Sequence, residues 1–200
     1  MKNTIKTIVL ALLMAMGTSA FSQGGGIWNF QWTIGVPTGA TNDFLSAPSF
    51  RGFAIQGGGY VTDNLMIGGR AGWQVFYKDY GFVTRKSDNY AISGYQRRYI
   101  NAVPLTINLN YFFGHGMVLP YIGFGVGPYY IETRDYMGIY YLRENKWHFG
   151  LAPEIGVMIP FGSNSNVGAN LAAKYQYAFK TKDTSAQSWF EFNIGISYIF

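Results

Sequence analysis

Four charged residues lie within stretches of alternating apolar and polar side chains: Arg70, Glu154, Lys174 and Glu191. All four stand on the polar side of the alternation, so they share a face with amide side chains. Two positive and two negative charges enclosed on one face would pair, because a buried charge needs a partner. We predict an ion-pair network on this face. The amides expected to support it are Gln56, Gln74, Asn108, Asn170 and Gln176.

A second group of charges lies between residues 78 and 98, where it includes Arg85, Lys86, Arg97 and Arg98. Arginine and lysine bind phosphate groups through charge-assisted hydrogen bonds. These four residues are candidates for a phosphate-bearing partner, and a solvated surface loop is the simpler interpretation. The formal charge of the whole chain is only +5, which is too small to indicate binding to nucleic acid.

Catalytic and cofactor chemistry has little support in the sequence. The chain contains two histidines, His115 and His148, and no cysteine, which disfavours a specific zinc site. Acyl transfer needs a nucleophile, a base within reach and a group that orients the base, and no suitable serine spacing accompanies His148. The glycines of residues 123–127 lack the spacing and the following helix of a dinucleotide-binding loop. We therefore expect no enzyme, no metal and no cofactor.

The first 22 residues have the features of an export signal. Lys2 and Lys6 precede an apolar run over residues 8–16, and the small residues Ala20 and Ser22 suit cleavage before Gln23. The apolar run is too short for a spanning helix, which needs about 20 residues. We predict a signal peptide over residues 1–22 and one domain over residues 23–200.

The composition favours a protein that crosses a membrane as strands. Aromatic residues make up 18% of the chain and charged residues only 12%, whereas soluble domains carry about a quarter charged residues. No apolar run after residue 22 approaches the length of a transmembrane helix. An exported chain of this kind is typical of an outer-membrane β-barrel, whose strands have one lipid-facing side and one interior side.

Period-2 alternation recurs eight times along the chain. In the first segment, Trp28, Phe30 and Trp32 alternate with Asn29 and Gln31. The eight segments lie at residues 28–36, 51–61, 65–77, 99–111, 121–130, 147–159, 167–179 and 190–200. We predict an all-β, eight-stranded, antiparallel up-and-down transmembrane barrel. A soluble lipocalin-like barrel would place its apolar side chains inside instead.

The connections between these segments alternate in length. Tight links are expected at residues 62–64, 114–117 and 161–166, and longer polar loops at residues 37–50, 78–97, 132–146 and 180–187. Outer-membrane barrels have short periplasmic turns and longer external loops. An even number of strands then leaves both termini in the periplasm. Counting from the short links brings Glu154 and Lys174 to nearly the same height on adjacent strands.

The last strand and three internal segments resemble small OmpA/OmpX-like outer-membrane barrel proteins. The internal segments are residues 103–105, 120–127 and 152–156, and the chain ends in an alternating strand that closes on phenylalanine. The resemblance implies an outer-membrane location and insertion by the barrel assembly machinery, which would read the C-terminal strand. The residues of that insertion signal would be Phe192, Ile194, Ile196, Tyr198 and Phe200. Outer-membrane lipid and lipopolysaccharide are the expected surroundings.

The function expected from this fold is structural or interactive. External loops would contact lipopolysaccharide, through the basic residues of the 78–98 segment, or an extracellular or envelope protein. The interior network either closes the barrel, which its narrowness favours, or gates a small passive channel. A component of a secretion apparatus and a lipid A-modifying enzyme using His148 are less favoured alternatives.

Overall fold

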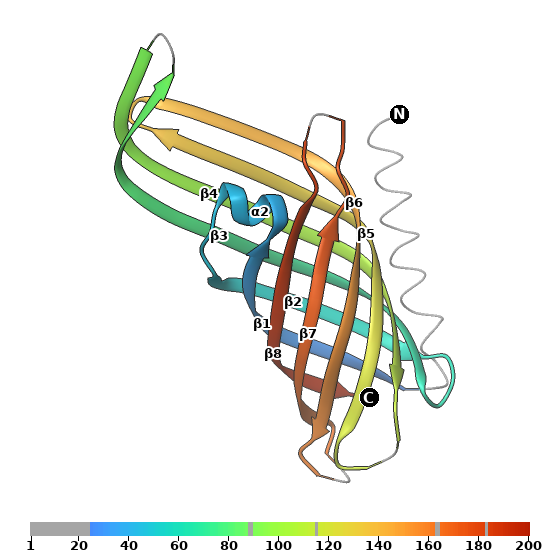
Figure 1. The fold of residues 1–200 in the computed structure, drawn as a ribbon. Helices are drawn as coiled ribbons and strands as arrows, with labels where there is room; N and C mark the ends of the chain where they lie inside the picture. Colours follow the sequence, from blue (N-terminus) through green and yellow to red (C-terminus); the bar gives the residue numbers. More distant parts are fainter. Residues whose placement is uncertain (1–24, 88–89, 115, 163–164, 183) are drawn as a thin grey trace, which may run out of the picture.

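The computed structural model describes residues 25–200 apart from 88–89, 115, 163–164 and 183. Eight strands pair in chain order, and β8 pairs with β1 to close an antiparallel up-and-down barrel (Figure 1). The strands are β1 (Gly26–Thr38), β2 (Ser49–Tyr60), β3 (Leu65–Ser87), β4 (Tyr90–Phe112), β5 (Leu119–Met137), β6 (Tyr140–Pro160), β7 (Val167–Ala178) and β8 (Gln187–Ile199). This confirms the predicted fold class. The proposed signal segment and His115 lie outside the described residues.

The two faces of the wall differ as the alternation predicts. On β1, Trp28, Phe30 and Trp32 are about half exposed on the outside, while Asn29 and Gln31 are buried inside. The same holds over the middle of the other strands, so the barrel presents apolar side chains outward and, in its central band, polar ones inward. That arrangement is the reverse of a soluble lipocalin-like barrel. In the described part of the chain, no helix has the length and apolar character needed to cross a bilayer.

Both ends of the described chain meet at one end of the barrel, where Gly26 N donates to Phe200 O at 2.8 Å. The links at residues 61–64, 113–118 and 161–166 lie at the same end, which we call the short-turn end. Figure 1 shows the opposite end extended on one side by two long hairpins. We call this the long-hairpin end.

Two of the four loops expected at the long-hairpin end are strands, so that part of the sequence prediction is wrong. The ladder between β3 and β4 continues from Lys78 opposite Arg98 up to Ser87 opposite Tyr90. The ladder between β5 and β6 continues to Met137 opposite Tyr140. The regular apolar alternation stops there, yet main-chain hydrogen bonds continue the sheet. We call residues 78–98 and 132–146 together the extension.

The connection between β1 and β2 contains a six-residue helix, α2 (Gly39–Phe44), where the sequence indicated only a polar loop. Helix α2 lies beside the barrel mouth at the long-hairpin end (Figure 1). Thr41, within the helix, and Leu45, directly after it, are fully buried. The connection therefore packs into the mouth of the barrel rather than standing in solvent.

Candidate functional site: the filled lumen and the extension

A row of charges crosses the inside of three adjacent strands. Glu154 on β6 is the register partner of Lys174 on β7, which is in turn the partner of Glu191 on β8. Lys174 Nζ lies 2.9 Å from Glu154 Oε2, and both side chains are fully buried. Arg70 reaches from β3 on another part of the wall and pairs with Glu191. The structure thus brings together all four residues of the expected network.

Hydrogen bonds connect this row to both ends of the barrel. Towards the short-turn end, the Tyr121 hydroxyl donates to Glu154 at 2.9 Å and accepts from Asn170 at 3.1 Å. Towards the long-hairpin end, Gln176 donates to Glu191 at 3.1 Å and accepts from the Tyr129 hydroxyl at 2.6 Å. The charges are therefore held by neutral polar groups above and below them.

Two glycines make room for the large interior side chains. A Cβ at Gly156 would lie 2.5 Å from the Tyr121 ring, and a Cβ at Gly72 would lie 2.9 Å from Arg70 Nη1. Glycine in a strand often marks such a close approach. The inward-facing glycines of the sequence thus allow a narrow barrel to enclose tyrosine and arginine.

Apolar side chains form a cluster in the lumen at each end of the polar band, a feature that the sequence analysis missed. At the long-hairpin end the cluster consists of Leu45, Phe76, Ile100, Ala102, Tyr129, Ile131, Ala178 and Trp189. At the short-turn end it consists of Ile27, Met66, Phe112, Tyr121, Met158 and Ala172. Apolar residues at single inward positions near strand ends were the available signal. The lumen therefore contains a charged centre between two apolar layers.

Arg98 joins the connection between β1 and β2, which contains α2, to the extension. Its Nη1 donates to Phe44 O at 2.6 Å, and its guanidinium lies 4.7 Å from the Phe44 ring and 5.3 Å from the Tyr80 ring. Its Nε contacts Asp135 at 3.1 Å. On the barrel side, the Thr41 hydroxyl donates to Gln187 at 2.9 Å. Arg98 therefore links the connection between β1 and β2, which contains α2, to the extension.

The structure separates the four basic residues expected to contact phosphate. Arg98 faces inward, while Arg97 faces outward with its Nε 3.1 Å from Asp79. Arg85 is exposed and lies 3.9 Å from Asp135, and the side chain of Lys86 lies outside what the structure describes. Neighbours in the sequence point to opposite faces because the segment is a strand.

The outward face of the extension carries arginines that the sequence analysis did not select. Glu132 on β5 pairs with Arg134 on the same strand and with Arg143 on β6, whose Nε lies 2.7 Å away. The hydrogen bond from Arg134 is the main cause that lowers the pKa of Glu132. The same contact raises the pKa of Arg134. Nearby, the backbone N–H of Gly81 lowers the pKa of Asp79.

His148 shows no arrangement typical of acyl transfer. It is buried inside the barrel, where Nδ1 lies 2.8 Å from the backbone oxygen of Phe179. A base that acts on lipid A would have to reach the lipid face instead. Among the described residues, no group of three or more histidine, cysteine, aspartate or glutamate side chains could hold a metal ion.

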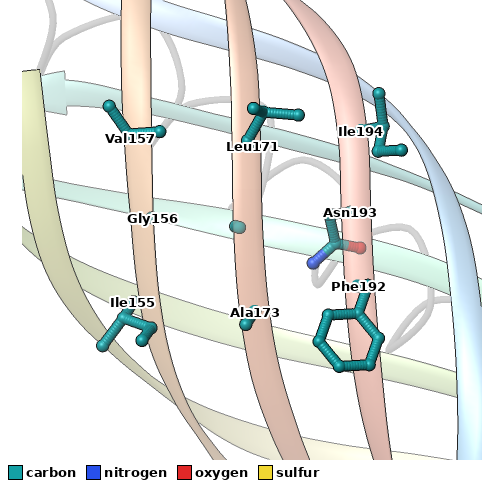
Figure 2. Close-up of a pocket in the computed structure, with 9 residues that line it drawn as sticks. Ile155, Gly156, Val157, Leu171, Ala173, Phe192, Asn193 and Ile194 are labelled. Carbon is teal, nitrogen blue, oxygen red and sulfur yellow. The ribbon is translucent and has the colours of Figure 1, made fainter. Parts of the chain in front are cut away.

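The residues of the expected insertion signal face outward on β8 and directly after it. Each is about half exposed: Phe192, Ile194, Ile196, Tyr198 and Phe200. Figure 2 shows that two of them, Phe192 and Ile194, border a shallow apolar depression that continues over Leu171 and Ala173 of β7 to Ile155 of β6. The small Ala173 between larger neighbours produces the hollow.

This geometry agrees with the comparison with protein families. A family model described as the outer membrane protein beta-barrel domain matches residues 8–200. The chain belongs to this family. It is therefore an integral β-barrel protein of the bacterial outer membrane. No curated protein matches the chain at a significant level.

Solved structures share the fold at low sequence identity. Neisserial surface protein A is 17% identical with a TM-score of 0.58, covering 89% of this chain and 98% of its own. The outer-membrane protein OprG of Pseudomonas aeruginosa is 16% identical with a TM-score of 0.53, covering 90% and 97%. The outer-membrane protease OmpT of Escherichia coli is 8% identical with a TM-score of 0.51, covering 92% and 99%. At these identities the likeness concerns the fold alone.

Proposed function

We propose that this outer-membrane protein is a non-conducting, non-catalytic binding protein that acts through its extension. The observation that carries the proposal is a contrast between the two parts of the molecule. The barrel interior is filled by a paired charge row between two apolar clusters, whereas four strands run past the barrel and expose aromatic and basic side chains. A closed interior leaves the extension as the surface available for binding.

The long-hairpin end would face the outside of the cell. Short periplasmic turns and longer external connections are general in this class of barrel, and both described termini lie at the short-turn end. We infer that both termini are periplasmic after removal of a signal peptide. In this orientation, the outward row of β8 would be the surface read by the barrel assembly machinery during insertion.

A channel gated by the lumenal charges is the alternative with a specific observation behind it. Lys174 is the register partner of both Glu154 and Glu191, so it could exchange one carboxylate for the other. Such an exchange would shift the charged centre, but it would leave Glu154 without its cation, because Arg70 already pairs with Glu191. The two apolar clusters argue against conduction, because they would still obstruct both ends.

Single-channel conductance in a planar bilayer tests the closed lumen. We expect no discrete steps from the refolded wild type, and none from a Lys174→Ala, Glu154→Ala double variant, since the apolar clusters remain. Steps in the wild type that the double variant enlarges would establish the gated channel and overturn the proposal.

A shortened protein tests whether the extension is dispensable for folding. Residues 79–97 and 134–143 would each be replaced by an Asn-Gly turn, which suits two-residue hairpins. We expect heat-modifiable migration and β-sheet circular dichroism as in the wild type, because the shortened ladders end at Lys78 opposite Arg98 and at Thr133 opposite Glu144. Failure to insert would mean that the extension serves folding rather than binding.

A further inference from the structure

We propose that the outward face of the extension binds the phosphorylated sugars of lipopolysaccharide, in a pocket built from Arg97, Arg134 and three tyrosines. The inference rests on the proposed function and names its ligand. The pocket encloses about 440 Å³. Its lining residues are Tyr95, Arg97, Tyr99, Arg134, Tyr136 and Gly138.

Tyrosine and arginine alternate across two neighbouring strands of this pocket. Tyr99 on β4 is the register partner of Arg134 on β5, and two positions further out Arg97 is the partner of Tyr136. Each arginine therefore lies beside an aromatic ring on the next strand. Gly138 adds no side chain at the outer border, so the pocket stays open there.

Aromatic rings extend this surface over all four strands of the extension. The ring centroids of Tyr77 and Tyr99 are 4.6 Å apart, those of Tyr99 and Tyr136 are 5.9 Å apart, and those of Tyr136 and Tyr141 are 4.6 Å apart. The Tyr136 and Tyr141 rings are stacked, while the Tyr99 ring meets Tyr136 edge to face. Together these rings offer apolar faces with hydroxyls at their edges. A sugar ring has the matching shape and polarity, with apolar C–H faces and hydroxyl edges.

The arginines supply the part of the pocket that recognises an anion. Arg97 Nε donates a hydrogen bond to Asp79, and Arg134 Nε donates one to Glu132. A guanidinium held by Nε has its two terminal NH₂ groups as further donors, and these suit a bidentate contact with phosphate. The two carboxylates therefore orient the arginines towards a ligand.

The position of the pocket relative to the membrane favours a ligand that is part of a membrane lipid. Tyr130 and Trp147, with ring centroids 5.3 Å apart, belong to the outward aromatic row near the barrel rim. Arg134 stands four residues beyond Tyr130, which places it about 13 Å further along the strand. With a strand tilt of about 40°, this is about 10 Å further from the membrane core.

That height corresponds to the outer headgroup layer and the first sugars above it. Tyr99 and Arg97 also lie on the same face as the lipid-facing Leu105 and Ile107. The pocket therefore opens sideways to the molecules that surround the barrel in the membrane. Among these, lipopolysaccharide combines sugars with phosphate groups, as the tyrosines and arginines require.

The test compares binding of purified rough-type lipopolysaccharide with binding of the same material after removal of its phosphates. Full-length protein in detergent micelles would be titrated with each probe. We expect the wild type to bind the phosphorylated form at least tenfold more tightly, and an Arg97→Gln, Arg134→Gln variant to lose at least that factor. Equal binding of both forms by the wild type, or unchanged binding by the variant, would overturn the proposal.

The matched control is Arg85→Gln, compared with the single variant Arg97→Gln, because each removes one charge from the extension and only Arg97 lines the pocket. Arg85→Gln should bind like the wild type, and a loss equal to that of Arg97→Gln would show that only overall charge matters. An excess of inorganic phosphate should not displace the lipopolysaccharide, because free phosphate lacks the sugar; full displacement would indicate a site for free phosphate instead. Failure of these binding tests would leave the conductance and shortening results unaffected, so the two proposals fail separately.

Discussion

Ion pairs occur in two regions of this protein, and their surroundings give them different consequences. In the lumen, Lys174 and Glu154 are fully buried, whereas in the extension the side chains of Arg97 and Asp79 are 53% and 41% exposed. An exposed charge that loses its partner is solvated by water, and such pairs contribute little to stability. A buried charge that loses its partner has no water to replace it. The lumenal pairs therefore constrain the fold, while the exposed pair of Arg97 and Asp79 contributes little to stability.

The largest expected effect is the loss of one lumenal partner. Lys174→Ala leaves Glu154 buried without its cation, and we expect a loss of about 3–5 kcal/mol in the free energy of unfolding. Equilibrium unfolding in urea of the protein refolded into lipid vesicles would measure it. A loss below about 1 kcal/mol would mean that water reaches Glu154 in the lumen.

The matched variant removes both charges. Lys174→Met combined with Glu154→Gln keeps a carbonyl oxygen to accept from the Tyr121 hydroxyl, and replacing a buried pair in this way is often neutral. We expect the double variant to be more stable than the single one. If both lose equally, the packing of the lysine stem rather than charge pairing accounts for the loss.

An intermediate effect is expected at the border between the two regions, where Arg98 joins the connection between β1 and β2 to the extension. Arg98→Ala removes the hydrogen bond to Phe44 O and the contact with Asp135. We expect a loss of about 2 kcal/mol in unfolding free energy, since hydrogen bonds to charged groups are stronger than neutral ones.

The control for that prediction is Arg85→Ala. Arg85 Nη2 lies 3.9 Å from Oδ2 of the same Asp135, but the side chain of Arg85 is largely exposed. We expect a change within about 0.5 kcal/mol, as for most surface substitutions. Equal losses in the two variants would contradict the idea that Arg98 stabilises the connection between β1 and β2.

The smallest effect concerns acid pH and the extension alone. The arginine contacts lower the pKa of the Glu132 carboxyl below its ordinary value of 4.5. A group with a lowered folded-state pKa contributes stability above its unfolded-state value and loses it as the pH falls through the folded-state value. We therefore expect the outer hairpins to loosen slightly below about pH 4.5.

Carbon-13 NMR of the Glu132 carboxyl would follow this titration directly. The urea midpoint of a Glu132→Gln variant should lack the corresponding component of the pH dependence. A carboxyl that titrates at or above its ordinary pKa would show that the contacts with Arg134 and Arg143 do not persist in solution.

The alternation of side chains made most of the barrel predictable. Trp28, Phe30 and Trp32 face outward and Asn29 and Gln31 face inward, because successive side chains in a strand point to opposite faces. The same parity places Arg70, Glu154, Lys174 and Glu191 on one face of the wall. Counting from the short links also placed Lys174 beside Glu154, and the two are register partners.

The alternation of side chains did not predict the strands of the two long hairpins. Residues 78–98 mix charges with aromatic residues and lack a regular apolar face. Their richness in tyrosine, phenylalanine and β-branched residues was the remaining signal for strands. Because the segment is a strand, Arg97 and Arg98 point to opposite faces. Arg97 faces outward, and Arg98 faces inward and contacts Phe44 at the end of α2.

The sequence by itself determined the number of strands and which side chains face outward or inward. It also determined that two positive and two negative charges face the lumen. All of these depend on local periodicity. Only the tertiary structure decided that Arg70 meets Glu191, that Leu45 packs into the apolar cluster at the long-hairpin end, and that Arg97 and Arg134 share one pocket. Those contacts join residues far apart in the chain. They depend on barrel closure and strand register, which the pattern of one strand does not contain.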